Sequence, residues 1–230
     1  MSRLEIEGLC KTLGDKRAAS ASVVLRGVTF SISDSECLGL RGATGSGKTT
    51  LLRIIAGLNT PDTGSVSLDG TVLSSPSTQV PPGQRGIGMV FQNLGLWPHL
   101  TVQGHLDYVL SATRMSAGER QQRRQETLET FLLRDLAARF PAELSGGERH
   151  LLALARALCA DIRILLMDEP FTGLDGALKE RVLQTLNKER SRRQLTTLLV
   201  THNEDEIRLL CQRVEHLSEG RIVVHAARKL

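Results

Sequence analysis

A nine-residue segment rich in glycine constrains this chain more than any other part of the sequence. It reads GATGSGKTT and matches the pattern G-x-x-x-x-G-K-[ST]. The apolar run Cys37–Leu40 comes before it, and a helix is expected over Gly47–Gly57. Glycines allow backbone N–H groups to curl around an anion, and the helix N-terminus adds its positive dipole end. The alternative interpretation is a plain glycine turn before a core helix. The segment, called the phosphate loop below, consists of Gly42, Ala43, Thr44, Gly45, Ser46, Gly47, Lys48, Thr49 and Thr50.

A second chemical feature is a pair of acids that follows a buried strand. The run Ile164–Met167 is wholly apolar and ends at Asp168 and Glu169. In open α/β sheets, ligands bind at the carboxyl ends of the strands. Lys48 supplies a point charge for phosphates, while the Thr49 hydroxyl and Asp168 suit a magnesium ion. Glu169 suits a base that orients water on a terminal phosphate. Many strands end in acids, so this pair is informative only together with the phosphate loop.

A third feature is the motif LSGGE at residues 144–148. It opens a helix whose apolar face is formed by Leu151, Leu154, Ala155 and Leu158. A serine hydroxyl, two glycines and a helix N-terminus form a second, smaller anion site. The alternative is an ordinary helix cap. One chain therefore carries two helix ends that are suited to phosphate.

The order of predicted elements indicates an α/β fold. The chain begins with strands at Leu4–Leu9 and Val23–Ile32, on either side of a Gly/Ser/Ala loop at residues 14–22. Residues 60–86 are rich in Gly, Pro, Ser and Thr, with short strands at most. Residues 93–160 are mainly helical, and Ser116 with Glu119 predicts a capping box for a helix that runs to Leu132. Strands then alternate with helices again, which favours a mostly parallel sheet with helices on both faces.

Composition excludes several classes of protein. The 230 residues include 40% hydrophobic and 23% charged residues, as in an ordinary globular domain, and no apolar run approaches the 18 residues of a membrane span. The N-terminus lacks the apolar core of a signal peptide. Aromatic residues make up 3%, which argues against a base-stacking surface and a nucleic-acid partner. The net charge is +4. Four dispersed cysteines form no CxxC pair and are expected to be small buried hydrophobes in a reducing compartment.

The LSGGE motif, placed between the phosphate loop and the acidic pair, resembles the signature motif of ABC-type ATPases. Other positions agree with that resemblance in their order and spacing. The resemblance covers the chain from about Leu4 to Val224. Gln92 resembles the Q-loop glutamine, Asp175 the D-loop aspartate, and His202 the switch histidine. Taken singly, a glutamine in a turn or a histidine at a strand end is most often structural.

The resemblance implies a P-loop NTPase core with a mostly parallel sheet, an N-terminal antiparallel β-subdomain and an inserted α-helical subdomain. The single domain would span 1–230, with 1–92 and 161–230 as the nucleotide-binding core and 93–160 as the helical subdomain. Such proteins bind ATP and Mg²⁺ and hydrolyse ATP in pairs. Each ATP lies between the phosphate loop of one domain and the signature helix of the other.

The resemblance also assigns roles to single residues. Lys48 and the amides of the phosphate loop would hold phosphates, and Thr49, Asp168 and Gln92 would serve Mg²⁺. Glu169 would be the general base, and His202 would contact the γ-phosphate. The residues expected to contact ATP from the partner are Ser145, Gly146, Gly147, Glu148 and, bridging the two sites, Asp175. Leu13 occupies the place where the family often stacks adenine on an aromatic ring, with Val24 beside it.

The segment around Gln92 indicates a subfamily. Residues 85–92 and 96–102 resemble the ATPases of binding-protein-dependent importers. This implies membrane permease partners, a substrate-binding protein, and a cytoplasmic position on the inner face of the cell membrane. Trp97 and the helix Thr101–Leu110 are expected either to receive the permease or to form the core of the helical lobe.

Several alternatives stay open at this point. The chain could instead drive export or the extraction of lipids or lipoproteins, or be a soluble ABC-type protein of DNA repair or translation. A small-molecule kinase built on a phosphate loop would leave LSGGE without a purpose. The pair could contain two copies of this chain or one copy and a paralogue, and the cargo is not encoded here.

Overall fold

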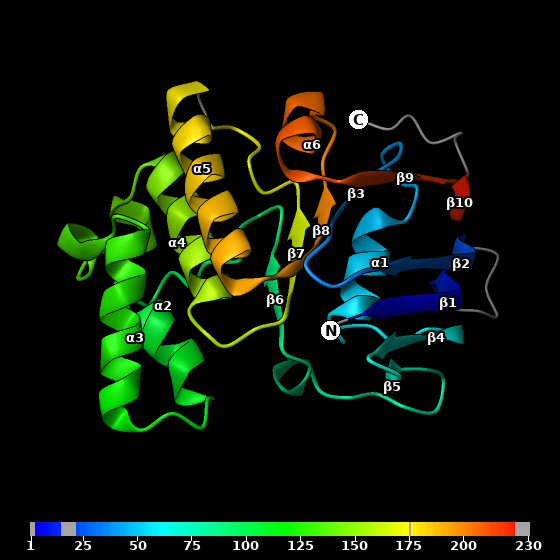
Figure 1. The fold of residues 1–230 in the computed structure, drawn as a ribbon, viewed down its shortest axis with the longest axis horizontal. Coiled ribbons are helices and arrows are strands. Elements are labelled where there is room, and N and C mark those ends of the chain that lie inside the picture. The colour runs from blue at the N-terminus through cyan, green and yellow to red at the C-terminus, as the bar shows by residue number, and fades with distance from the viewer. Residues whose placement is uncertain (1–2, 15–21, 175, 224–230) are drawn as a thin grey trace.

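Two β-sheets pack around the helix that follows the phosphate loop. The computed structural model describes residues 3–14, 22–174 and 176–223. In the described residues, a six-stranded sheet has the order β10-β9-β3-β8-β7-β6 and a four-stranded sheet the order β2-β1-β4-β5 (Figure 1). The strands of the larger sheet are β3 (Cys37–Arg41), β6 (Ile87–Val90), β7 (Ile164–Asp168), β8 (Thr196–Val200), β9 (Arg213–Ser218) and β10 (Arg221–Val223).

The larger sheet is mostly parallel, as predicted. Four of its pairings are parallel, and only β10 runs antiparallel to β9. The smaller sheet is fully antiparallel and forms the expected N-terminal β-subdomain. Its strands are β1 (Leu4–Leu13), β2 (Ser22–Ile32), β4 (Thr63–Leu68) and β5 (Thr71–Ser74). The segment 60–86 thus supplies two real strands, and most of the predicted loop at 14–22 lies outside the described residues.

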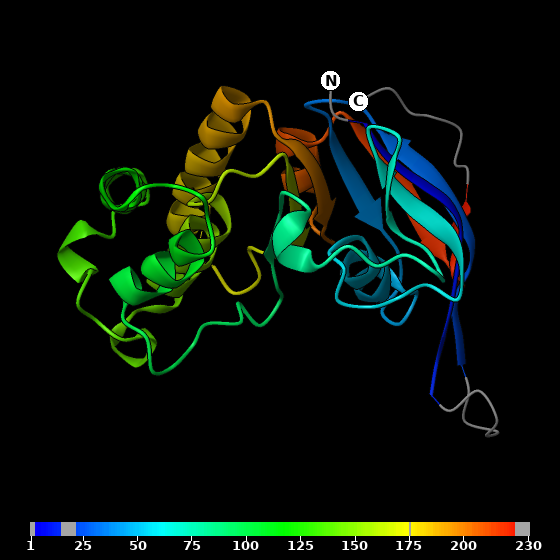
Figure 2. The same cartoon turned by 90° about the horizontal axis from the view of Figure 1, so that it is seen from below.

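Helices cover both faces of the larger sheet. The α-helices are α1 (Lys48–Ile55), α2 (Val102–Ser111), α3 (Ala117–Thr130), α4 (Gly146–Leu158), α5 (Gly176–Arg193) and α6 (Glu204–Leu210). Single 3-10 turns are η1 (Pro82–Gln84), η2 (Arg134–Leu136) and η3 (Pro141–Glu143). The helices α2, α3 and α4 lie at the opposite end of the molecule from the four-stranded sheet (Figure 2). No helix in the described part of the chain is long and apolar enough to cross a membrane.

The larger sheet separates two hydrophobic clusters, and alternate residues of its buried strands belong to one cluster or the other. In β3 and β8, Leu38, Leu40 and Leu198 belong to the hydrophobic cluster around α1, whereas Cys37 and Leu199 belong to the cluster around α4 and α5. Successive side chains of a strand point to opposite faces, so one strand contributes to both clusters. Strands that are buried on both faces read as continuous apolar runs, which is why the sequence revealed them.

Local signals set the helix ends. The capping box of Ser116 and Glu119 is confirmed, although α3 ends at Thr130, two residues before the predicted end. Helix α1 is shorter than the predicted Gly47–Gly57, because Gly47 and Gly57 adopt φ values of +107° and +83°. Such left-handed backbone terminates a helix. Of the four cysteines, three are buried as expected and Cys10 is half-buried.

A buried arginine holds the far end of α1. Arg85 is 1% exposed. Its guanidinium donates to the carbonyl oxygens of Ile54 (3.2 Å) and Ile55 (2.9 Å) at the end of α1, and of Leu73 (2.8 Å) and Val80 (2.7 Å). A helix C-terminus attracts a cation, which offsets the cost of burying the charge. Arg85 therefore joins α1, β5 and the chain that enters β6.

We predict that Arg85→Met lowers the free energy of unfolding by about 3 kcal/mol, because four buried carbonyl oxygens lose a donor. Urea denaturation followed by circular dichroism measures this loss. Arg163→Met is the matched control, since Arg163 is largely exposed and pairs with Asp69. The control should lose less than about 1 kcal/mol. Equal losses in the two variants would contradict the role given to Arg85.

Candidate functional site

The phosphate loop connects β3 to α1 and lies directly on β2. Gly42, Gly45 and Gly47 all have positive φ. A Cβ on Gly47 would lie 2.8 Å from a Leu25 methyl carbon and 2.9 Å from the Val24 carbonyl oxygen, so only glycine fits there. The Ser46 hydroxyl is buried and has no hydrogen-bond partner among the described residues. A buried polar group without a protein partner suits a loop that receives an anion.

A cavity of about 420 Å³ opens at this loop. It lies where the carboxyl ends of β3, β7 and β8 meet, which is the ligand-binding edge of such a sheet. Leu13 at the end of β1 and Val24 on β2 form its apolar wall, and Leu13 is 41% exposed. The described residues that line the cavity are Leu13, Val24, Thr44, Gly45, Gly47, Lys48, Thr49, Thr50, Gln92, Asp168, Glu169 and His202.

Thr49 and Asp168 meet inside the cavity. The Thr49 hydroxyl donates to Asp168 Oδ2 at 2.7 Å. Burial raises the pKa of Asp168, and the hydrogen bond from Thr49 only partly opposes that shift. A buried carboxylate that is costly to ionise is suited to receive a divalent cation. In the described residues no three acidic, histidine or cysteine side chains are arranged so that together they could hold a metal ion. A magnesium ion here would therefore take further oxygen ligands from phosphate and water, as Mg²⁺ commonly does.

Lys48 is folded back onto its own loop. Its ammonium donates to the carbonyl oxygens of Gly42 at 2.6 Å and Ala43 at 2.9 Å. Burial lowers the pKa of Lys48, while Glu169 and Asp168 act in the opposite direction. The only cation within the loop is thus held by two carbonyl oxygens of the loop itself. There it can exchange carbonyl partners for phosphate oxygens.

Glu169 lies between two polar side chains. Its Oε1 is 3.0 Å from His202 Nε2, and its Oε2 accepts from Gln92 Nε2 at 3.4 Å. Glu169 has a φ of +47°, which is strained for a residue with a Cβ. Its backbone N–H still donates to the Val200 carbonyl oxygen at 2.9 Å. The chain therefore turns sharply after β7, and the structure brings Gln92, Glu169 and His202 together although they are far apart in sequence.

The LSGGE motif forms the N-terminus of α4 and lies elsewhere. Ser145 is the N-cap: its Oγ accepts from the Glu148 N–H at 3.3 Å, and Glu148 Oε2 accepts from the Ser145 N–H at 2.7 Å. These bonds lower the pKa of Glu148. In this cap the Glu148 carboxylate accepts a hydrogen bond, and the Ser145 hydroxyl acts only as an acceptor. The hydroxyl hydrogen of Ser145 can therefore be donated to another group. None of the described residues that line the cavity comes from residues 145–148.

The two glycines of the motif have different surroundings. A Cβ on Gly147 would lie 1.9 Å from Leu178 Cδ2 on α5, so Gly147 is a packing residue. A Cβ on Gly146 would meet no described atom within 4 Å, and both Ser145 and Gly146 are exposed. The tip formed by Ser145 and Gly146 is thus open to an approaching group. Asp175 lies outside the described residues.

The sequence interpretation missed Arg156. This side chain is 7% exposed on α4 and donates to the carbonyl oxygens of Leu94, at 2.8 Å, and Gly95. Its guanidinium also lies 5.0 Å from the ring centre of Trp97. The ring centres of Trp97 and Tyr108 are 4.9 Å apart. The available signal was a charge that interrupts the apolar stretch of the helix. Trp97 is therefore packed in the helical lobe, while Tyr108 beside it is 61% exposed.

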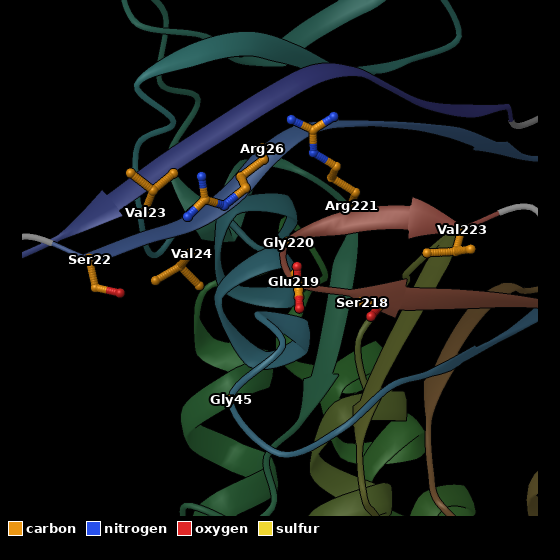
Figure 3. A pocket seen from close by; sticks show the side chains of 10 residues that line it. All are labelled: Ser22, Val23, Val24, Arg26, Gly45, Ser218, Glu219, Gly220, Arg221 and Val223. Atoms are coloured by element: carbon orange, nitrogen blue, oxygen red, sulfur yellow. The ribbon is translucent and has the colours of Figure 1, made fainter.

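A second cavity of about 630 Å³ lies beside the first, between β2 and the hairpin of β9 and β10. Figure 3 shows Arg26 and Arg221 extending from their strands in different directions. Both side chains are exposed. The two cavities share Val24 and Gly45 as lining residues.

Comparisons with known proteins agree on one family. A family model described as ABC transporter matches residues 25–172. A sulfate/thiosulfate import ATP-binding protein of Mycolicibacterium paratuberculosis is 40% identical over 87% of this chain and 54% of its own length. A spermidine/putrescine import ATP-binding protein of Thermotoga maritima is 38% identical over 87% of this chain and 53% of its own length. The chain thus spans about half the length of these curated relatives.

A solved structure agrees as well. It is a dimeric ATP-binding cassette in a post-hydrolysis state, bound to ADP and Pi. The TM-score is 0.86 at 30% sequence identity, with 96% of this chain and 97% of that chain covered. The sheet and helix arrangement described above is therefore that of an ATP-binding cassette.

We predict that Asp168→Asn raises the free energy of unfolding of the ligand-free protein at neutral pH. The raised pKa of Asp168 means that ionisation costs more in the folded than in the unfolded protein. Stability therefore falls as pH rises from about 3.9 through the raised pKa, and the cost is complete above it. The advantage of Asp168→Asn should vanish as pH falls towards 4. Urea unfolding at several pH values measures it, with the exposed Asp161→Asn as a control. If Asp168→Asn destabilised the protein at neutral pH, the ionised Asp168 carboxylate would not be a cost to the folded state, and the prediction would be wrong.

Proposed function

The chain belongs to the ABC transporter family, and we propose that it is the ATP-binding and ATP-hydrolysing subunit of a membrane importer. One observation carries the proposal. The cavity gathers a phosphate loop, a hydrogen-bonded threonine–aspartate pair and the group Gln92, Glu169 and His202, whereas the open tip at Ser145 and Gly146 lies outside it. A triphosphate held by both features requires a second protein chain.

The cavity suits ATP with magnesium. Amides of the phosphate loop, the Ser46 hydroxyl and Lys48 would hold the phosphates. Thr49 and Asp168 would hold the metal, with Gln92 as a third oxygen donor. The ion would supply charge neutralisation at the β- and γ-phosphates when bound. Leu13 and Val24 would contact adenine through apolar surface alone, without an aromatic stack.

Hydrolysis would follow from the position of Glu169. Its carboxylate accepts a proton from the attacking water as the water oxygen bonds to the γ-phosphorus and the bond to the bridging oxygen breaks. Gln92 and His202 hold the two carboxylate oxygens, so the base is oriented before substrate arrives. His202 is half exposed towards the cavity mouth, where it would contact the terminal phosphate. The products are ADP and free phosphate.

The working unit would be two copies of this chain in a head-to-tail pair. The Ser145 hydroxyl and the first amides of α4 would bind the triphosphate that lies on the phosphate loop of the other copy. Gly147 allows α4 to pack against Leu178, which fixes the direction of the tip. Glu148 would act through the cap of this helix, and Asp175 would bridge the two sites. The dimeric state of the similar cassette with ADP and Pi supports this arrangement.

The importer role rests on the curated relatives, which are named as import ATP-binding proteins. A permease would bind the helical subdomain at residues 93–160, with the exposed Tyr108 beside Trp97 as part of the contact. A substrate-binding protein would deliver the cargo on the other side of the membrane. The chain itself would lie on the cytoplasmic face, attached through the permease.

We predict that Glu169→Gln retains ATP binding but lowers the rate of phosphate release at least about 100-fold, because the base is lost. The same variant should accumulate as a dimer with ATP, as measured by light scattering. Glu129→Gln, an exposed change on α3, is the matched control and should behave as wild type. Normal hydrolysis by Glu169→Gln would place the base elsewhere. Transfer of phosphate to a small molecule, with no free phosphate, would support a kinase instead.

A further inference from the structure

A buried carboxylate that the proposed mechanism does not use lies close to His202. Glu206, in the first turn of α6, is 4% exposed. Its Oε1 lies 2.5 Å from the ammonium of Lys179 on α5, and its Oε2 accepts a hydrogen bond from the Thr201 hydroxyl. A buried carboxylate needs donors on both oxygens, and this one has them from two separate elements.

Hydrogen bonds between Glu206, Thr201 and Asn203 fix the loop that carries His202. The Thr201 hydroxyl, besides donating to Glu206, accepts from the Asn203 N–H at 3.1 Å. The Asn203 side chain in turn accepts from the Glu206 N–H at 3.2 Å. The residues on both sides of His202 are thus bonded to Glu206. The direction of the His202 ring towards Glu169, at 3.0 Å, depends on this loop.

Lys179, the partner of Glu206, lies beside a residue that packs against the N-terminus of α4. Lys179 lies in the first turn of α5, next to Leu178. Leu178 packs so closely against Gly147 that a Cβ there would lie 1.9 Å from its Cδ2. The first turn of α5 therefore contacts the helix of Ser145 through Leu178, and through Lys179 it contacts Glu206, which is bonded to the loop of His202.

We propose that Glu206 is a positioning residue that couples His202 to the first turn of α5 and, through Leu178, to the Ser145 tip. A nucleotide of the partner bound at that tip would bias the contact between His202 and Glu169 in the chain's own cavity. This inference rests on the proposed function for its purpose, but the coupling itself is a property of the single chain. Lys179 and Glu206 then act as one unit, since removal of Lys179 leaves the buried Glu206 carboxylate without its charged partner.

The coupling is testable without nucleotide, by amide hydrogen exchange on the full chain. Glu206→Gln should speed exchange about tenfold or more both in residues 201–206 and in residues 176–182, because the two segments share one buried contact. Glu204→Gln makes the same chemical change on the same helix at a largely exposed position, and should alter neither segment. Faster exchange in 201–206 alone would overturn the coupling.

Kinetics test the positioning role. Glu206→Gln should lower kcat for ATP about tenfold while KM changes less than about twofold, because the His202 loop is displaced and the phosphate loop is not. Lys179→Met should do the same, and the double variant Lys179→Met/Glu206→Gln should be no worse than either single one. The double variant removes both charges, so it can be measured in place of a single variant that does not fold. A raised KM with unchanged kcat, or additive losses, would refute the role. Absence of ATP hydrolysis by the wild type would refute the proposed function, and the exchange comparison would still decide the coupling.

Discussion

Two helix N-termini that attract anions are kept apart within one chain, and the proposed dimer depends on this separation. The N-terminus of α1 closes the phosphate loop at a cavity that Lys48 lines, and the buried Ser46 hydroxyl has no hydrogen-bond partner among the described residues. The N-terminus of α4 is exposed and contributes no described residue to that cavity. Each end carries free N–H groups and a partial positive charge. A triphosphate that satisfies both ends would therefore lie between two chains, and its charge would join them.

The chemistry on the cavity side is set by what each strand presents at its carboxyl end. Asp168 ends β7 and accepts from Thr49, while Glu169 turns away through a left-handed backbone towards Gln92 and His202. Two adjacent acids thus face different partners and take different roles. The pair of Lys179 and Glu206 links the loop of His202 to the first turn of α5, which packs on the helix of Ser145. The proposed partner-binding tip and the proposed phosphate-contacting histidine would therefore be connected through one buried carboxylate.

Sequence reasoning recovered the features that local backbone chemistry encodes. The phosphate loop, the caps at Ser116 and Ser145, and the buried runs of β3 and β7 all follow from short-range patterns. Contacts across the fold were not predictable. Arg85 sits in a segment rich in glycine and proline, and nothing nearby shows that it ends α1. Glu206 reads as one of three acids in a first turn, and only the structure shows that it alone is buried.

One measurement tests the shared site most directly: retention of ATP after desalting by mixed variants, all carrying Glu169→Gln to stop hydrolysis. One variant adds Lys48→Ala, which disables the phosphate loop, and the other adds Ser145→Arg, which blocks the tip. A mixed pair has one intact site, formed by the phosphate loop of one chain and the tip of the other. If the two chains share each site, the mixture retains one ATP per two chains and neither variant retains ATP alone. Retention by the Ser145→Arg variant alone, or none in the mixture, would contradict it.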